Sequence, residues 1–244
     1  MGGATHLIGT LLNIGSVLLG GGLGTLLGDR LPQPIRETVM HGIGLVTLVV
    51  GMHLTMETQN TLIVLVSVLI GGILGEWWRI SAGLDRASEW LRTRVAARVG
   101  ERRMGRFTEG FATASLVFCV GPMTILGAIR DGLSGDISLL AIKSVLDGFT
   151  AMAFASTLGI GVLFSMLTLL LYQGGITLLA GVAEQVLNPA MIAEMTATGG
   201  VLILAIGLML LEIKRIRVAN LLPALVVAPV IVAILQALGL PLAP

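Results

Sequence analysis

Apolar stretches of about 20 residues recur along the whole chain and are separated by short polar breaks. A helix of that length crosses a hydrocarbon core roughly 30 Å thick. The 244 residues are 55% hydrophobic and 12% charged, whereas an ordinary soluble domain carries about 25% charged residues. This composition excludes a water-soluble fold and predicts an all-α integral membrane protein, with a single transmembrane domain covering residues 1–244.

The apolar windows predict about eight transmembrane helices. Their expected ranges are 7–28, 38–56, 62–75, 111–129, 137–155, 158–182, 191–211 and 218–238. The first helix carries a ridge of small residues, Gly20, Gly24 and Gly28, which we expect to pack closely against another helix.

The longest polar stretch, Trp77 to Arg106, holds eight of the fifteen basic residues. Its apolar side chains recur at helical spacing, at Ile80, Leu84, Ala87, Leu91 and Val95. This pattern predicts an amphipathic helix on the membrane surface that binds anionic lipid, with its tryptophans near the headgroups. A small solvated cytoplasmic hairpin is the alternative.

The basic residues also predict the orientation, because loops rich in lysine and arginine stay on the cytoplasmic side. With eight crossings, the stretch from Trp77 to Arg106 shares one side with Arg30, Arg36 and the cluster Lys214 to Arg217, so that 13 of 15 basic residues agree. A single crossing between 137 and 184 would move that cluster to the other side. We therefore expect two crossings there, a cytoplasmic basic stretch and both termini outside, although a re-entrant fifth or sixth segment stays open.

Two similar octets suggest an internal repeat: residues 44–51 read GLVTLVVG and residues 200–207 read GVLILAIG. Each is followed by a polar hinge, with Glu57 or Glu212, and then by another apolar span. The predicted topology runs spans one to three opposite to spans six to eight, as in the inverted repeats of secondary transporters. The expected parts are a first repeat at 1–76, the basic segment at 77–106, a central helix pair at 107–156 and a second repeat at 157–244. Chance similarity of glycine- and leucine-rich segments is the alternative.

The pattern E-x-x-A-T, followed by two small residues, begins at Glu109 and again at Glu194. A carboxylate is favoured at a helix N-terminus, and Thr113 and Thr198 follow one turn later on the same face. We expect these four residues to line a path for a small solute or ion. Helix capping with small-residue packing is the alternative.

The fifth span contains Lys143 and Asp147, four residues apart and therefore on one helical face. Ionisable side chains inside a membrane usually face a cavity or a partner, so Asp147 is predicted to be a protonatable or cation-binding carboxylate. In the alternative, Lys143 snorkels to the interface and hydroxyl groups satisfy Asp147. Asn13 and Gln173 are further polar candidates for the path, or they form interhelical hydrogen bonds only.

The fourth span is interrupted by the sequence CVGP, which predicts a helix break at Gly121 and Pro122. Broken helices expose backbone groups that can bind ions or solutes, and an ordinary proline kink is the alternative.

Several motifs are missing from the sequence. It has no Walker A loop, no dinucleotide-binding glycine pattern, no HExxH and no metal-binding spacing of cysteine and histidine. We expect no enzymatic activity, no cofactor, no metal and no nucleic-acid partner.

The sequence resembles the YqgA/YdfK family of bacterial inner-membrane proteins over nearly its full length. The similar segments are NIGSVLLGGGLGTLLGDRLPQPIRETVMHGIGL, ETQNTLIVLVSVLIGGILGE, ATASLVFCVGPMTILGAIRDGLSGD, KSVLDGF, AFASTLGIGV, YQGGITLLAG and AEMTATGG. The resemblance implies a multi-pass protein of the bacterial inner membrane, and it supplies no substrate because the family is a domain of unknown function.

Together these patterns predict a secondary transporter or channel for a small polar solute or ion, coupled to protons or sodium. A membrane scaffold or sensor that acts through its basic segment is the alternative. The sequence leaves a homo-oligomer open.

Overall fold

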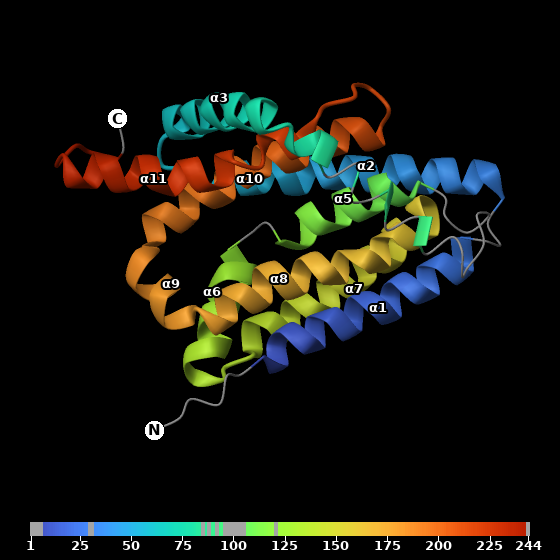
Figure 1. Ribbon diagram of the computed structural model, residues 1–244. Helices are drawn as coiled ribbons and strands as arrows, with labels where there is room; N and C mark the ends of the chain where they lie inside the picture. The colour runs from blue at the N-terminus through green and yellow to red at the C-terminus, as the bar shows by residue number, and fades with distance from the viewer. Residues whose placement is uncertain are drawn as a thin grey trace. The chain divides into compact units, whose positions relative to one another are not determined.

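The computed structural model describes residues 7–28, 32–83, 86, 89–90, 93–94, 106–119 and 122–242. These described residues form helices and no strands (Figure 1). Seven helical segments among them are long and apolar enough to cross a membrane: Ile8–Gly28, Gln33–Thr55, Thr61–Trp78, Ser138–Leu158, Ile160–Leu178, Pro189–Leu210 and Val218–Ala237. A bent pair, Phe107–Cys119 and Met123–Ser134, brings the total to as many as eight. The predicted all-α, multi-pass fold is confirmed, and each predicted window coincides with one of these segments.

The helices group into two compact units that interleave along the chain. The first consists of Met1–Ile43 and Ala87–Gln185, and the second of Gly44–Arg86 and Val186–Pro244. The boundary lies inside α2 (Gln33–Thr55). This grouping describes packing, whereas the predicted repeats concern internal similarity, so the repeat boundaries stay a prediction.

The first unit is built on the close packing of α1 (Ile8–Gly28) against α7 (Ser138–Leu158), which run side by side (Figure 1). A Cβ atom at Gly20, Gly24 or Gly28 would lie only 2.0, 2.2 or 2.4 Å from the backbone oxygens of Gly148, Met152 and Ser156. The predicted ridge of small residues is thus confirmed as the contact. Because both sets of numbers increase together, the two helices run in the same direction.

Besides the N-terminal part of α2, the first unit also contains α5 (Phe107–Cys119), α6 (Pro122–Ser134), η2 (Ile160–Phe164), α8 (Ser165–Leu178) and α9 (Ala180–Val186). The helix α8 packs on α1, α5 and α6. The continuous segment of η2 and α8 runs opposite to α1, since Gly21 lies beside Leu163 of η2 and Thr10 contacts Thr177 of α8.

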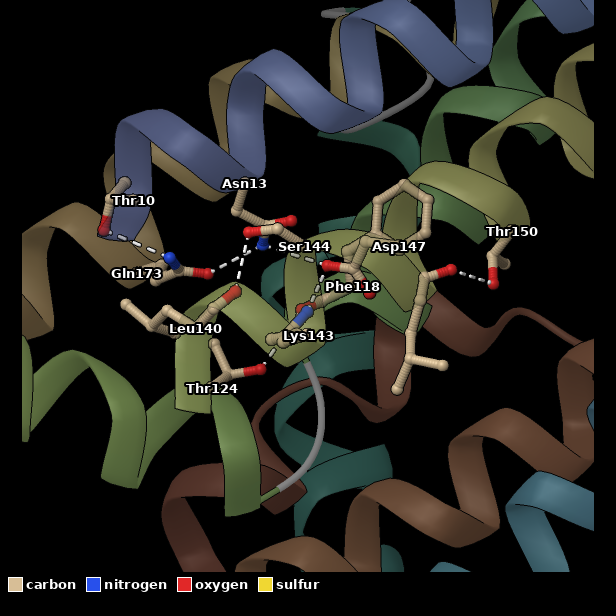
Figure 2. Close-up of polar contacts among 11 residues, drawn as sticks. Thr10, Asn13, Phe118, Thr124, Leu140, Lys143, Ser144, Asp147, Thr150 and Gln173 are labelled. Atoms are coloured by element: carbon tan, nitrogen blue, oxygen red, sulfur yellow. Dashed lines mark hydrogen bonds and ion pairs between the residues drawn. The ribbon is translucent and has the colours of Figure 1, made fainter. Parts of the chain in front are cut away.

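The break between α5 and α6 bends the chain by 64°. It falls where the sequence predicts a break, although Gly121 and the side chain of Pro122 lie outside the described part of the chain. Proline has no N–H group, so the carbonyl of Phe118 cannot receive the usual helical bond from residue 122. The hydroxyl of Thr124 donates to that carbonyl instead, at 3.2 Å (Figure 2).

The second unit contains the C-terminal half of α2 together with α3 (Thr61–Trp78), α10 (Pro189–Leu210), η3 (Val218–Leu221) and α11 (Ala224–Ala237). Asparagine side chains cap two of its helices, since Asn60 accepts from the Leu62 N–H and Asn188 from the Met191 N–H. The helix α3 packs on η3 and α11 through glycines, and a Cβ at Gly75 would lie 1.8 Å from the Asn220 oxygen.

The two similar octets pack against each other within the second unit. A Cβ at Gly51 would lie 2.9 Å from the Gly200 oxygen, and a Cβ at Gly207 would lie 3.1 Å from the Leu48 nitrogen. The helices α2 and α10 are therefore antiparallel here. The wider correspondence between the two triplets of spans stays a prediction.

The basic segment is described only in part. The helix α3 extends to Trp78, beyond its predicted end at residue 75, and Arg79 ends it in the left-handed conformation, with a φ of 53°. The structure does not describe four of the five regularly spaced apolar residues of this segment, namely Leu84, Ala87, Leu91 and Val95. Arg30 also lies outside the described residues. The amphipathic surface helix therefore stays a prediction.

Candidate functional site

Buried polar side chains form a hydrogen-bonded chain between α1, α7 and α8 in the first unit (Figure 2). The Asp147 Oδ2 atom accepts a hydrogen bond from Asn13 Nδ2 at 2.9 Å and forms an ion pair with the Lys143 ammonium group. Asn13 Nδ2 also donates to Gln173 Oε1 at 3.1 Å. One amide nitrogen thus lies between a carboxylate oxygen and an amide oxygen.

Two threonines extend the chain beyond Gln173. The Gln173 Nε2 atom donates to Thr10 Oγ1 at 3.1 Å, and the Thr10 and Thr177 hydroxyl oxygens are 3.4 Å apart. Thr177 also donates to the backbone oxygen of Gln173 at 3.0 Å. The polar chain therefore continues from the ion pair toward the N-terminal end of α1.

Helical spacing and glycine packing position these groups. Each of the three helices contributes two of them, three or four residues apart and therefore on one face. Close approach of α1 and α7 at Gly20 and Gly148 brings the face with Asn13 onto the face with Asp147. A larger residue at this crossing would separate the two polar side chains.

The site is buried deep within its helices. Asn13 and Gln173 are 0% exposed, Lys143 is 5% exposed and Asp147 is 7% exposed. Asp147 is the tenth of 21 residues in α7, about 14 Å from the first residue and about 17 Å from the last at 1.5 Å per residue. Lys143 points inward to this carboxylate, in contrast to the snorkelling arrangement considered for it.

The site combines one positive and one negative charge with an incomplete set of hydrogen bonds. The oxygen of the Asn13 amide, Oδ1, is buried and has no hydrogen-bond partner among the described residues. A buried acceptor without a partner costs about 1–3 kcal/mol. The arrangement therefore has one oxygen available for a further ligand.

The structure brings together four of the eight predicted path residues: Asn13, Lys143, Asp147 and Gln173. The other four lie elsewhere. In the first unit, Glu109 forms an ion pair with Arg106 at 2.5 Å, and Thr113 is buried in α5. Glu194 and Thr198 belong to α10 of the second unit.

Glu194 binds the loop between α2 and α3. Its carboxylate, in a residue 2% exposed, accepts hydrogen bonds from the Thr58 hydroxyl at 2.7 Å and from the Gln59 and Asn60 N–H groups at 2.7 and 3.2 Å. Partial burial raises the pKa of Glu57 in the same loop, and the charge of His53 opposes this shift. The Glu194 carboxylate thus holds the start of α3 to α10.

We expect Glu194→Gln to weaken this attachment by about 1–3 kcal/mol, because an amide cannot accept on both sides as a carboxylate does. Hydrogen exchange should become faster at the Gln59 and Asn60 amides. Glu37→Gln, which alters an exposed carboxylate, should leave exchange at both amides unchanged. Equal protection in both variants would contradict the assignment.

Sequence reasoning missed Thr10 and Thr177 as members of the polar chain. The available signal was spacing, since Thr10 precedes Asn13 by three residues and Thr177 follows Gln173 by four. Hydroxyl groups in apolar helices are common and usually bond to their own backbone. The sequence therefore gives no reason to select these two threonines from the others.

Comparison with known proteins identifies relatives of undetermined function. A family model described as "Protein of unknown function (DUF554)" matches residues 8–233. The chain is 32% identical over 239 residues to "Uncharacterized membrane protein YdfK" of Bacillus subtilis (strain 168). This match covers 96% of the present chain and 99% of that protein. The chain is also 35% identical over 221 residues to "Uncharacterized protein YqgA" of Escherichia coli (strain K12). This match covers 91% of the present chain and 94% of that protein. No solved structure matches the chain.

These matches confirm the resemblance drawn from the sequence segments. They extend over nearly the whole multi-pass fold, and they cover the three helices that carry the polar chain. The protein therefore belongs to the DUF554 family of proteins of unknown function.

Proposed function

We propose that the protein is a secondary transporter or channel for a small polar solute or ion, and that the pair of Asp147 and Lys143 carries the coupling ion. The observation that supports this proposal is a charged pair buried near the middle of an apolar helix and joined to a polar chain across three helices. Ionisable groups in such positions are expensive and commonly mark ion or solute pathways.

The energetic balance favours a functional role for the pair. Replacing a buried ion pair by apolar residues of similar volume is often neutral or stabilising by about 1–4 kcal/mol. The ion pair therefore contributes little more stability to α7 than apolar residues would, so stability alone does not explain its presence. A group that binds and releases an ion needs the charge.

The break between α5 and α6 gives further support. Discontinuous helices form the binding sites of many transporters, because their ends expose backbone groups. This break lies in the same unit as the polar chain. The first unit thus combines two features that transporters use.

Reconstitution tests the proposal. Protein in liposomes with an entrapped pH-sensitive dye should change the internal pH when gradients of sodium, potassium or small metabolites are imposed. The double variant Lys143→Met/Asp147→Leu should show only the leak of protein-free liposomes, whereas Ser144→Ala should retain flux because its hydroxyl bonds only to its own helix. Equal flux in the double variant and the wild type would overturn the role of the pair.

A scaffold or sensor is the second candidate function, and the tryptophans favour it. Trp77 and Trp78 are 77% and 62% exposed, and the Arg94 guanidinium lies 4.3 Å from the centre of the Trp90 ring. Such side chains suit a headgroup layer that contains anionic lipid. Wild-type liposomes without flux under any gradient would favour this candidate.

The location and the orientation belong to the same proposal. We place the protein in a bacterial inner membrane with the basic segment in the cytoplasm and both termini outside, as the distribution of basic residues favours. We assign it no enzymatic activity.

A further inference from the structure

We infer that one end of the second unit binds the headgroup of an anionic phospholipid that carries two phosphate groups. The contacts come from Arg79, which follows α3, and from Lys214 and Arg215 in the loop after α10. This binding site goes beyond the proposed transport function and does not depend on it. It is also a different surface from the predicted amphipathic helix, because two of its three basic residues belong to another segment of the chain.

The loop after α10 lies beside the end of α3. The Arg217 Nη1 atom donates to both carboxylate oxygens of Glu76, at 2.8 and 3.1 Å. The Ser81 N–H group donates to Asn220 Oδ1 at 2.6 Å, and the backbone of Asn220 packs directly on Gly75. These contacts hold the two segments together at one end of the second unit.

Both α3 and α10 end here in the left-handed backbone conformation without a glycine. Arg79 has a φ of 53° and Glu212 a φ of 57°, and among the described residues they are the two with positive φ that are not glycine. This conformation is unfavourable for a residue with a Cβ atom, and such outliers cluster at functional sites. Lys214 follows the second turn by two residues. The basic side chains thus stand directly beyond two sharp helix ends.

The tryptophans mark the depth of this surface in the membrane. Trp77 and Trp78 are the last two residues of α3, and both are exposed. Tryptophan is enriched where the hydrocarbon core meets the lipid headgroups. Arg79 directly follows them, and Lys214 and Arg215 lie in the segment between two spans. The basic side chains therefore lie at the level of the phosphate groups.

The charge of the surface favours a headgroup with two phosphates. Residues 76–79 and 212–217 contain four basic residues and two carboxylates, which leaves a net charge of +2. Arg217 already binds Glu76. The other three basic residues are exposed and form no ion pair with a described residue: Arg79, Lys214 and Arg215. Two linked phosphates can contact both segments at once, whereas one phosphate would leave a basic residue without a partner.

A lipid fits this surface better than a soluble phosphate compound. The exposed apolar side chains Leu69, Ile73 and Trp77 follow one another at a spacing of four residues on α3 and therefore lie along one face. This apolar face leads to the basic residues. An acyl chain can lie along it while the headgroup contacts Arg79.

Native mass spectrometry of the purified, delipidated protein in detergent tests the inference. The lipids added in turn are diphosphatidylglycerol with two phosphates, phosphatidylglycerol with one, and phosphatidylcholine without net charge. The wild type should retain one diphosphatidylglycerol molecule at a concentration about tenfold lower than phosphatidylglycerol requires, because a second phosphate adds charged contacts. It should retain no phosphatidylcholine. Equal retention of the two anionic lipids would overturn the inference.

Charge variants at the surface test which residues bind. Lys214→Gln/Arg215→Gln should weaken retention of diphosphatidylglycerol about thirtyfold, which corresponds to about 1 kcal/mol for each of the two charges. Arg79→Gln should weaken it about fivefold for the same reason. Lys214→Arg/Arg215→Lys keeps both charges and should retain the lipid as the wild type does. Unchanged retention in Lys214→Gln/Arg215→Gln would contradict the assignment.

Controls separate this surface from other occupants and other segments. Arg130→Gln removes one exposed charge in the first unit and should retain the lipid as the wild type does. A loss of retention in Arg94→Gln, with none in Lys214→Gln/Arg215→Gln, would assign the lipid to the predicted amphipathic helix and overturn the inference. Displacement of the lipid by an equal concentration of inorganic pyrophosphate would show that the surface binds phosphate groups alone, which would overturn a lipid as its occupant.

Discussion

Asp147→Leu alone should lower the free energy of unfolding by about 3–5 kcal/mol, because it leaves the buried Lys143 ammonium without its partner. Lys143→Met alone should also destabilise the protein, since it leaves the carboxylate unpaired. The double variant Lys143→Met/Asp147→Leu should return to within about 1 kcal/mol of the wild type or exceed it. Apolar side chains of similar volume would then fill the same space.

The single cysteine provides the measurement. Cys119 is buried in the same unit, so a thiol-reactive fluorescent dye labels it only when this unit unfolds. A loss of 3–5 kcal/mol should lower the unfolding temperature by roughly 6–20 °C for a chain of this size. A double variant as unstable as Asp147→Leu would show that packing rather than charge pairing governs this site. A double variant with normal stability but without flux would show that transport needs the charged pair and that folding does not.

Gly20→Ala should destabilise the first unit, whereas Gly22→Ala should be neutral or stabilising. At Gly20 the new Cβ would lie 2.0 Å from the Gly148 backbone oxygen, so α1 and α7 must move apart. At Gly22 nothing lies within 4 Å of the new Cβ. Overpacking costs about 1–3 kcal/mol or more, while alanine gains up to about 1 kcal/mol over glycine in a helix.

The same dye measurement on Cys119 compares the two glycine variants, which differ by two positions on one helix and by one methyl group each. Separation of α1 and α7 should also lengthen the contact between Asn13 and Asp147, so Gly20→Ala should lose flux as well as stability. Two variants with equal unfolding temperatures would contradict the packing of α1 on α7.

Helix positions could be predicted from the sequence because each helix must cover the hydrocarbon core by itself. Apolar length therefore gives the spans almost directly. Ends are less certain, and α3 continues to Trp78 because aromatic side chains are compatible with the last turn of a membrane helix. The grouping of helices into two units could not be predicted, since it depends on which faces pack together.

The residues of the candidate site could be predicted, but their arrangement could not. Lys143 and Asp147 are conspicuous because charge is rare in apolar helices. Their connection to Asn13 depends on the register of α1 against α7, which many small contacts set. The Glu194 carboxylate could not be assigned either, because its partners are backbone N–H groups of a distant loop.

The sequence contains a second pair of similar glycine-rich segments, besides the two octets. Residues 16–24 read SVLLGGGLG and residues 67–75 read SVLIGGILG, and these segments belong to α1 and α3. In each unit such a glycine segment packs closely on the backbone of a helical segment far along the chain, α7 or η3 with α11. Similar sequences thus perform the same packing role in both units.

The shared direction of α1 and α7 has a topological consequence. Two helices that cross in the same direction must be separated by an odd number of crossings. If α2 and α3 each cross once, the bent pair of α5 and α6 must supply the third crossing, because a re-entrant loop would return the chain to the side it left and reverse α7. The opposite directions of α1 and α8 likewise require η2 and α8 to cross. If α2 and α3 each cross once, the directions of α1, α7 and α8 thus favour a broken span at the proline, and six crossings precede α10.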